Sequence, residues 1–349
     1  MGSSSSKFSG AGYAPPALPN KVYTTEYLAT LPSMAGKVVV VTGASSTDGL
    51  GWVCAKTLAS KGATIVLLNR ASDRAVNAEK KLKESVPSAD VSTIDCDLSS
   101  FSSTQAAAAA LKAKFSETGI DVLCNNAGVM ALKDQATADG YDVQMQTNHL
   151  SHFLLTREVF PLLDKAAELR GEARVVHHSS GARSMGGALN AKYFGKNGGK
   201  LGGDSSSMFF GGARWTRYGQ TKLANAVFTL ALRDKLQTKG SKVKALCAAP
   251  GLAASQLQAT TYSDGGMGSG TWFMSYAQSP EDGAVSLIEC CARPGLKNGD
   301  CLEPSGMAHM VGKPGPFYPE REFMGPATPA ARALLWTESE KAVGGKWDL

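Results

Sequence analysis

The stretch Val38-Val-Val-Val-Thr-Gly43-Ala-Ser-Ser-Thr-Asp-Gly49-Leu-Gly51 decides the fold of this 349-residue chain. Its four valines predict a buried β-strand, and the glycine-rich turn after them leads into a helical pattern. Such a turn lets backbone N–H groups approach a pyrophosphate, and the N-terminus of the following helix favours negative charge. The stretch therefore predicts a dinucleotide site, with Gly51 allowing the helix to pack closely on the sheet. The alternative is a glycine turn that merely ends a strand.

Strands and helices alternate along the chain after this turn. Predicted strands cover residues 37–42, 63–68, 90–94, 120–124, 174–178 and 243–246. Predicted helices cover residues 51–61, 73–85, 101–115 and 218–239, and a further helical pattern runs to residue 163. This alternation implies right-handed crossovers between parallel strands. We therefore predict the α/β class, as a single Rossmann-type doubly wound parallel sheet with helices on both faces.

The chain is expected to form one domain behind a short N-terminal arm. Residues 1–35 are rich in Ser, Gly and Pro, which predicts a flexible arm in which Tyr23–Leu31 packs on the domain. Residues 36–345 contain no linker and no internal repeat. No apolar run approaches the ~18–20 residues that a membrane-spanning helix needs.

Composition excludes two further classes. The 36 basic and 30 acidic residues give a net charge of +6, and no run of Lys and Arg concentrates it, so we expect no nucleic acid partner. The seven cysteines form no C-x-x-C pair. They predict buried thiols in a reducing compartment, either cytoplasmic or organellar, and not a disulfide framework or a zinc cage.

The first seven residues, Met1-Gly2-Ser3-Ser4-Ser5-Ser6-Lys7, fit the pattern of N-myristoylation at Gly2. One acyl chain would give only reversible, peripheral contact with a membrane. The alternative is a flexible tail or an expression scar, since Met-Gly-Ser-Ser openings are common in recombinant proteins.

The end of the second predicted strand bears on the cofactor. A carboxylate at this place would bind the ribose 2′-OH of NAD, but Leu68-Asn69-Arg70 offers a guanidinium instead. Arginine suits a 2′-phosphate because it can bind it bidentately. We therefore favour NADP(H) over NAD(H). The alternative is that Arg70 is a solvated surface residue.

Tyr218 and Lys222 lie at positions i and i+4 of a predicted helix, about one turn apart on one face. A tyrosine beside a cation can act as a general acid, because the ammonium favours the phenolate and lowers the tyrosine pKa. Taken alone, the pair is unspecific and far more typical of an amphipathic helix surface. It gains weight from the motifs around it.

Several further motifs follow in a fixed order, and together they resemble the short-chain dehydrogenase/reductase family over about residues 37–302. They are the glycine turn, Asp97-Leu98, Asn125-Asn126-Ala127-Gly128, Asn148 in Asn-His-Leu-Ser-His-Phe, Ser179-Ser180, Tyr218-Gly-Gln-Thr-Lys222 and Pro250-Gly251. The phrases around Asn148 and Tyr218 are most similar to the retinol dehydrogenase and protochlorophyllide reductase branch.

The resemblance implies a mechanism in which Tyr218 exchanges a proton with the substrate oxygen and Ser180 hydrogen-bonds that oxygen. Lys222 would hold the ribose and tune Tyr218, and Asn148 would keep a helix open around a water linked to Lys222. The cofactor contacts that it implies are Gly43, Ser45, Ser46, Gly49, Leu50, Gly51, Arg70, Asp97, Leu98, Asn126, Ala127, Gly128, Tyr218, Lys222, Pro250, Gly251 and Ser255. Hydride would pass between the nicotinamide and a carbonyl carbon.

The chain departs from the family pattern at the glycine turn and in two loops. Thr47-Asp48 is an insertion in the turn, and we expect a bulged loop that preserves binding. The insertion 181–217 separates Ser180 from Tyr218, and it predicts either a flap over the substrate or a surface loop without function. With the glycine-rich substrate loop 255–280, it places apolar residues beside the site. These residues predict a bulky apolar carbonyl or alcohol as substrate, such as a retinoid, pigment or lipid.

Two other function hypotheses remain at this point, a protochlorophyllide reductase-like photoenzyme and a non-catalytic NADP(H)-binding sensor. No metal is expected, because His149 and His152 lack carboxylates or cysteines at ligand spacing and so predict structural roles. Family members commonly self-associate, which makes a homo-oligomer a further expectation.

Overall fold

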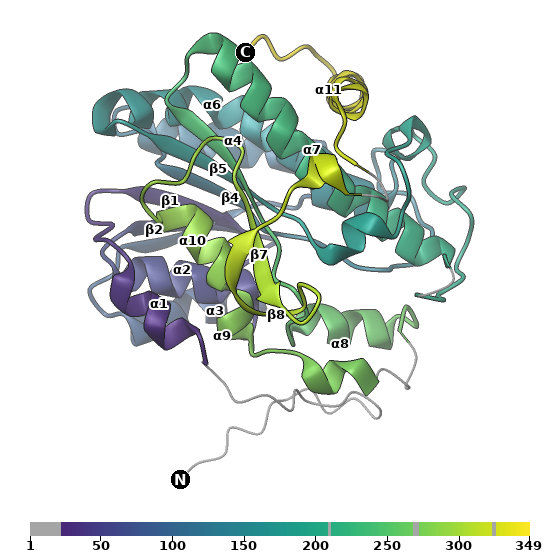
Figure 1. Ribbon diagram of the computed structural model, residues 1–349. Helices are drawn as coiled ribbons and strands as arrows, with labels where there is room; N and C mark the ends of the chain where they lie inside the picture. The colour runs from purple at the N-terminus through teal and green to yellow at the C-terminus, as the bar shows by residue number, and fades with distance from the viewer. Residues whose placement is uncertain (1–21, 209–210, 268–271, 323–325) are drawn as a thin grey trace.

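The computed structural model describes residues 22–208, 211–267, 272–322 and 326–349, which build one eight-stranded sheet (Figure 1). Its order is β3-β2-β1-β4-β5-β6-β7-β8, and every neighbouring pair is parallel except β7 and β8. The strands are β1 Val38–Thr42, β2 Thr64–Asn69, β3 Val91–Asp95, β4 Val122–Asn125, β5 Ala173–His178, β6 Val243–Ala248, β7 Cys301–Gly306 and β8 Val311–Pro316. The predicted doubly wound parallel sheet is confirmed.

Helices cover both faces of the sheet, because β1 alternates its side chains between two hydrophobic cores. Val38 and Val40 face the core formed with α4, α6, α7 and α11, whereas Val39 and Val41 face the core formed with α2, α3 and α10. The α-helices are α1 Thr24–Thr30, α2 Leu50–Ser60, α3 Asp73–Ser85, α4 Phe101–Phe115, α5 Val143–Met145, α6 Ser151–Arg170, α7 Ala213–Lys239, α8 Gln256–Ser263, α9 Pro280–Gly283, α10 Val285–Ala292 and α11 Pro329–Val343. All seven cysteines are buried and unpaired, as predicted.

Short helices of other types join these elements. A π-helix, η1 Gln146–Leu150, lies between α5 and α6. The 3-10 helices are η2 Gly181–Ser184, η3 Ala191–Phe194, η4 Trp272–Tyr276 and η5 Pro319–Arg321.

The sequence patterns missed the C-terminal edge of the sheet. Neither β7 nor β8 carries a β-branched run, and Pro304, Pro314 and Pro316 interrupt them, which is tolerated at an edge. The helix α7 also begins at Ala213, five residues earlier than predicted, because Gly212 supplies its N-cap. The predicted strands and the helices α2, α3 and α4 lie within about two residues of their observed bounds.

The described part of the N-terminal arm packs on the domain. Backbone N–H groups of Val22, Tyr23 and Thr24 donate to the carboxylate of Asp282, each at 2.8 Å, so that this side chain caps α1. Residues 1–21, with the pattern at Gly2, lie outside the described residues. Within the described chain, no helix combines the length and apolar character that crossing a membrane requires.

Candidate active site

The carboxyl ends of six parallel strands, β1 to β6, form one edge of the sheet and carry most of the predicted site residues. Ligands of open α/β sheets bind at this edge, where the strand order reverses, and here it reverses between β1 and β4. The predicted residues that follow these strand ends are Gly43, Ser45, Ser46, Gly49, Leu50, Gly51, Arg70, Asp97, Leu98, Asn126, Ala127, Gly128, Ser180, Pro250, Gly251 and Ser255.

The glycine turn after β1 has the geometry that a dinucleotide needs. Gly43 has a φ of +70°, and a Cβ on it would lie 2.6 Å from the Cα of Ala127, so only glycine fits. A Cβ on Gly51 would lie 2.3 Å from Asn126 Nδ2, which shows how closely α2 approaches the end of β4. None of the described side chains caps the N-terminus of α2 at Gly49, so its first N–H groups remain available to an anion.

The insertion Thr47-Asp48 forms the tip of a tight turn. The N–H of Gly49 donates to the carbonyl of Ser46 at 2.9 Å and closes the turn behind it. Asp48 is exposed at the tip. The insertion therefore bulges outward, as expected, and leaves Gly43 and Gly51 in contact with the end of β4.

The end of β2 presents one buried amide and one exposed cation. Asn69 Oδ1 accepts a hydrogen bond from the N–H of Ala44 at 2.8 Å, whereas its Nδ2 is buried without a partner among the described residues. Arg70 follows and is exposed. After β3, Asp97 Oδ1 accepts from the N–H and hydroxyl of Ser99, so this carboxylate orders its own loop.

Asn148 lies in the π-helix η1 and joins two parts of the site. Its Oδ1 accepts from the N–H of Val129 at 2.8 Å, and its Nδ2 donates to the carbonyl of Val129 and to Thr221 Oγ1, both at 2.9 Å. A Cβ on Gly128 would lie 3.2 Å from Asn148 Oδ1 and 3.5 Å from Lys222 Nζ. The predicted site residues Gly128, Asn148 and Lys222 therefore lie close together.

Lys222 is a buried amine in the middle of α7. Its Nζ donates to the carbonyl of His178 at 3.0 Å and lies 5.7 Å from the centroid of the Tyr218 ring. Burial lowers the pKa of Lys222 to about 8. The amine is therefore close to its titration point at neutral pH.

Tyr218 is also buried, and the Ser180 side chain lies near enough to its hydroxyl to affect the phenol pKa. Burial raises the pKa of Tyr218 above its ordinary value, and the Ser180 contact opposes that rise. The pKa of Tyr218 is therefore raised and not lowered as expected, because the effect of burying the phenol exceeds that of the Ser180 contact. The predicted companions Ser180, Tyr218, Lys222 and Asn148 do lie together.

Arg183 holds Ser180 in place, and sequence reasoning missed it. Its Nη1 donates to the carbonyl of Ser180 at 3.1 Å, and its guanidinium pairs with Glu303 on β7 at 2.8 Å and with Glu322 at 2.6 Å. Both carboxylates lie more than a hundred residues away in sequence, so only the position of Arg183, three residues after Ser180, could have suggested it.

Thr42 and His152 form a second arrangement that the motifs did not reveal. Thr42 Oγ1 accepts from the N–H groups of Asn126 and Ala127, at 3.0 and 2.9 Å. His152 Nδ1 lies 3.0 Å from the carbonyl of Asn148, so this nitrogen carries the proton, and Nε2 accepts from the Thr42 hydroxyl at 2.9 Å. Burial lowers the pKa of His152 to about 4, so it stays neutral and has the structural role predicted.

An apolar wall borders Tyr218 on the side of the two long loops. It comprises the buried residues Met130, Ala131, Ala182, Trp215, Tyr218, Ala254, Met267, Met274 and Ala277. Phe209 and Phe210, which the sequence placed in the flap, lie outside the described residues, as do the side chains of Trp272 and Phe273. The flap hypothesis for residues 181–217 stays a prediction.

The predicted residues after β6 serve mainly to shape the backbone. Gly251 has a φ of +66°, and a Cβ on it would lie 2.3 Å from the carbonyl oxygen of Met310. The Ser255 hydroxyl donates to Gln258 Oε1 at 2.5 Å, in a capping box at the start of α8.

Comparisons with known proteins agree with this geometry. Residues 37–199 match the family model for short chain dehydrogenases. The chain is 34% identical over 235 residues to an uncharacterized oxidoreductase of Schizosaccharomyces pombe, covering 67% of this chain but only 64% of that protein. It is 32% identical to human retinol dehydrogenase 11, over 76% of this chain and 75% of that protein. A crystal structure of an uncharacterized protein from Mycobacterium paratuberculosis superposes with a TM-score of 0.70 at 30% identity, covering 92% and 98% of the two chains. The chain therefore belongs to the short-chain dehydrogenase/reductase family of oxidoreductases.

Proposed function

We propose that this protein is an NADP(H)-dependent oxidoreductase that transfers hydride between the nicotinamide and a carbonyl or alcohol of a bulky apolar substrate. The observation that carries the proposal is the placement of the Tyr218 hydroxyl near Ser180, one helical turn from Lys222 and beside the apolar wall. A proton donor, an oxygen-binding hydroxyl and a cation in this arrangement suit reduction of a carbonyl.

The described residues fit a dinucleotide. Within the part of the chain that the structure describes, Gly43 is left-handed, the start of α2 is uncapped and Asn69 Nδ2 has no partner, which offers a close backbone approach and donors for phosphate and sugar oxygens. Lys222 would hold the nicotinamide ribose. When bound, the nicotinamide supplies the hydride in reduction or accepts it in oxidation.

Proton transfer falls to Tyr218. Because burial raises its pKa, Tyr218 keeps its proton at neutral pH and can donate it to a substrate oxygen. Ser180, held by Arg183, would donate a hydrogen bond to the same oxygen. The ammonium of Lys222 would stabilise the phenolate that forms when Tyr218 gives up its proton.

The apolar wall supports the substrate class. Methionine side chains adapt to irregular apolar shapes, and the wall holds Met130, Met267 and Met274. Among the relatives are proteins named retinol dehydrogenase 11 and polyprenol dehydrogenase, whose names point to isoprenoid alcohols. A panel of retinoid, steroid and fatty aldehydes with NADPH therefore tests the class directly.

The decisive variant is Tyr218→Phe. It should abolish turnover and leave NADPH affinity unchanged, measured by calorimetry. Tyr141→Phe is the matched control, because it removes another buried tyrosine hydroxyl, which donates to the carbonyl of Ala342 at 3.0 Å away from the site. Turnover by Tyr218→Phe close to that of the control would refute the assignment. NADPH binding without turnover of any aldehyde would favour the sensor, and turnover of a chlorophyll precursor only under light would favour the photoenzyme.

The cofactor preference rests on Arg70, which we propose binds the 2′-phosphate. Arg70→Ala should lower affinity for NADPH about 10- to 150-fold and leave NADH affinity unchanged, since one charge-assisted contact of this kind is worth roughly 1.5–3 kcal/mol. Arg74→Ala removes a second exposed arginine nearby and serves as the control. Equal losses in the two variants would show that only the local charge matters.

A further inference from the structure

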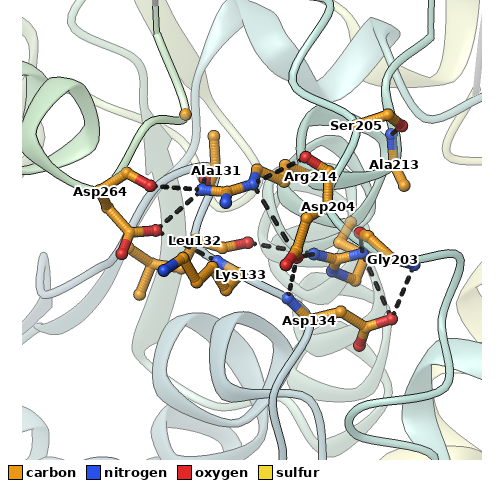
Figure 2. Close-up of polar contacts among 12 residues, drawn as sticks. Ala131, Leu132, Lys133, Asp134, Gly203, Asp204, Ser205, Ala213, Arg214 and Asp264 are labelled. Atoms are coloured by element: carbon orange, nitrogen blue, oxygen red, sulfur yellow. Dashed lines mark hydrogen bonds and ion pairs between the residues drawn. The ribbon is translucent and has the colours of Figure 1, made fainter.

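Arg214, in the first turn of α7, joins three separate segments beside the site (Figure 2). Its Nη1 donates to Asp264 Oδ2 at 2.8 Å, to the carbonyl of Asp264 at 3.0 Å and to the carbonyl of Ala131 at 3.3 Å. Asp264 directly follows α8, and Ala131 belongs to the loop after β4. One guanidinium, with its side chain 5% exposed, therefore links the end of the insertion to the substrate loop.

The insertion beneath Arg214 is firmly anchored. The carboxylate of Asp134 accepts the backbone N–H groups of Gly199, Leu201 and Gly203, at 3.0, 2.7 and 3.0 Å. Arg217, which is fully buried, donates to the carbonyl of Gly203 at 2.7 Å. The part of the insertion next to Arg214 is therefore held by hydrogen bonds to Asp134 and Arg217.

The helix α8 buries little of its own surface among the described residues. Thr261 is its one buried residue among those described, and the Thr261 hydroxyl donates to the carbonyl of Met130 at 2.9 Å. A helix that buries so little apolar surface gains little from the hydrophobic effect. Polar contacts therefore contribute to its position, and the ion pair between Arg214 and Asp264 is one of them.

Trp215 links the segment after α8 to Tyr218. Its Nε1 donates to the carbonyl of Gly266, two residues beyond Asp264, at 3.0 Å. Its ring meets the ring of Tyr218 edge to face, with 6.0 Å between centroids and an angle of 83°. When α8 is docked, Trp215 and Met267 close the apolar wall over Tyr218.

We propose that the ion pair between Arg214 and Asp264 is a clasp that docks the substrate loop on the insertion, and that Arg214 is a positioning residue for bulky substrates. The proposal rests on the proposed function for its substrate class. The clasp touches none of Ser180, Tyr218 or Lys222, so opening it changes how well a large apolar substrate is enclosed and leaves proton transfer intact.

The first test is the steady-state kinetics of Asp264→Asn with one bulky and one small aldehyde. KM for the bulky aldehyde should rise on the order of tenfold, which is about the effect of one charged hydrogen bond, whereas kcat and KM for the small aldehyde stay within twofold. Asp264→Glu keeps the carboxylate and should recover most of the loss. Asp164→Asn is the control, because Asp164 has the same 30% exposure and pairs with Lys239 at 2.9 Å far from the site. Equal KM values for both aldehydes in Asp264→Asn and Asp164→Asn would overturn the clasp.

The second test uses no substrate. Hydrogen exchange at the amides of Gln256–Ser263 should become at least tenfold faster in Asp264→Asn than in the wild type and in Asp164→Asn. Unchanged exchange in α8 would overturn the clasp even if the enzyme reduces apolar aldehydes. Faster exchange in an enzyme that reduces none of them would support the clasp and refute the proposed substrate class instead.

Discussion

Lys222→Met should make the protein more stable and inactive at the same time. Lys222 is 4% exposed, and its Nζ donates a hydrogen bond to the carbonyl of His178. Methionine has nearly the same length and no charge. The variant therefore removes the cation from the site while filling its space.

The size of the gain follows from the pKa of Lys222, which burial lowers from 10.5 to about 8. Each pKa unit corresponds to about 1.4 kcal/mol, so the charged amine costs the folded protein about 3 kcal/mol. The variant also loses the hydrogen bond to His178, which lowers its net gain in stability by about 1 kcal/mol. Below pH 8 the amine is charged in both the folded and unfolded chains, and the full cost applies. The cost disappears as the pH rises from 8 to 10.5, because the folded protein has already lost the proton.

Urea unfolding followed by tryptophan fluorescence measures this difference. Lys222→Met should be about 2 kcal/mol more stable than the wild type at pH 7, and at pH 10.5 the lost hydrogen bond should leave it up to about 1 kcal/mol less stable. The exposed Lys346→Met controls for removal of a lysine. A variant less stable than the wild type at pH 7, or a gain of the same size at both pH values, would refute the reasoning.

Three other variants test the scaffold of the site. Gly43→Ala forces a Cβ to within 2.6 Å of Ala127 at a φ of +70°, so it should lower the free energy of unfolding by about 2 kcal/mol and weaken NADPH binding in calorimetry. Asp282→Ala removes the cap of α1 and should cost about 1–2 kcal/mol and speed proteolysis near Thr24, with unchanged proteolysis contradicting the cap. Arg217→Met leaves the carboxylate of Asp142 without its cation 3.4 Å away and should cost about 3–5 kcal/mol in urea at pH 7. The loss of stability in Arg217→Met should become smaller toward pH 5, because burial raises the pKa of Asp142 to about 6 and protonation removes the buried charge. A loss of stability that does not change with pH would contradict this account.

Local patterns predicted the parts of the site whose geometry is itself local. The valines of β1 and the glycines after them specify a strand, a turn and a close approach, and the contacts of Gly43 and Gly51 confirm that approach. Spacing by four residues places Tyr218 and Lys222 on one face of a helix wherever that helix packs. Contacts that follow from strand or helix spacing could therefore be predicted from the sequence.

Contacts between polar residues far apart in the chain leave no such pattern. Arg183 meets Glu303 across 120 residues and Arg214 meets Asp264 across 50, and nothing in the sequence around either arginine marks its partner. The direction of the Tyr218 pKa was predicted wrongly for a related reason. It depends on how deeply tertiary packing buries the phenol, which a helical spacing does not specify.

These long-range arginines explain how the site tolerates the insertion between Ser180 and Tyr218. Closing a loop costs only about 0.6 kcal/mol for each doubling of its length, so a long insertion is cheap provided that its two ends are fixed. Arg183 fixes the end next to Ser180 by donating to its carbonyl and pairing with Glu303. Arg214 and Arg217 fix the end next to Tyr218 through backbone carbonyls and buried carboxylates. Ser180 and Tyr218 are therefore held near each other by the arginines at the two ends of the insertion.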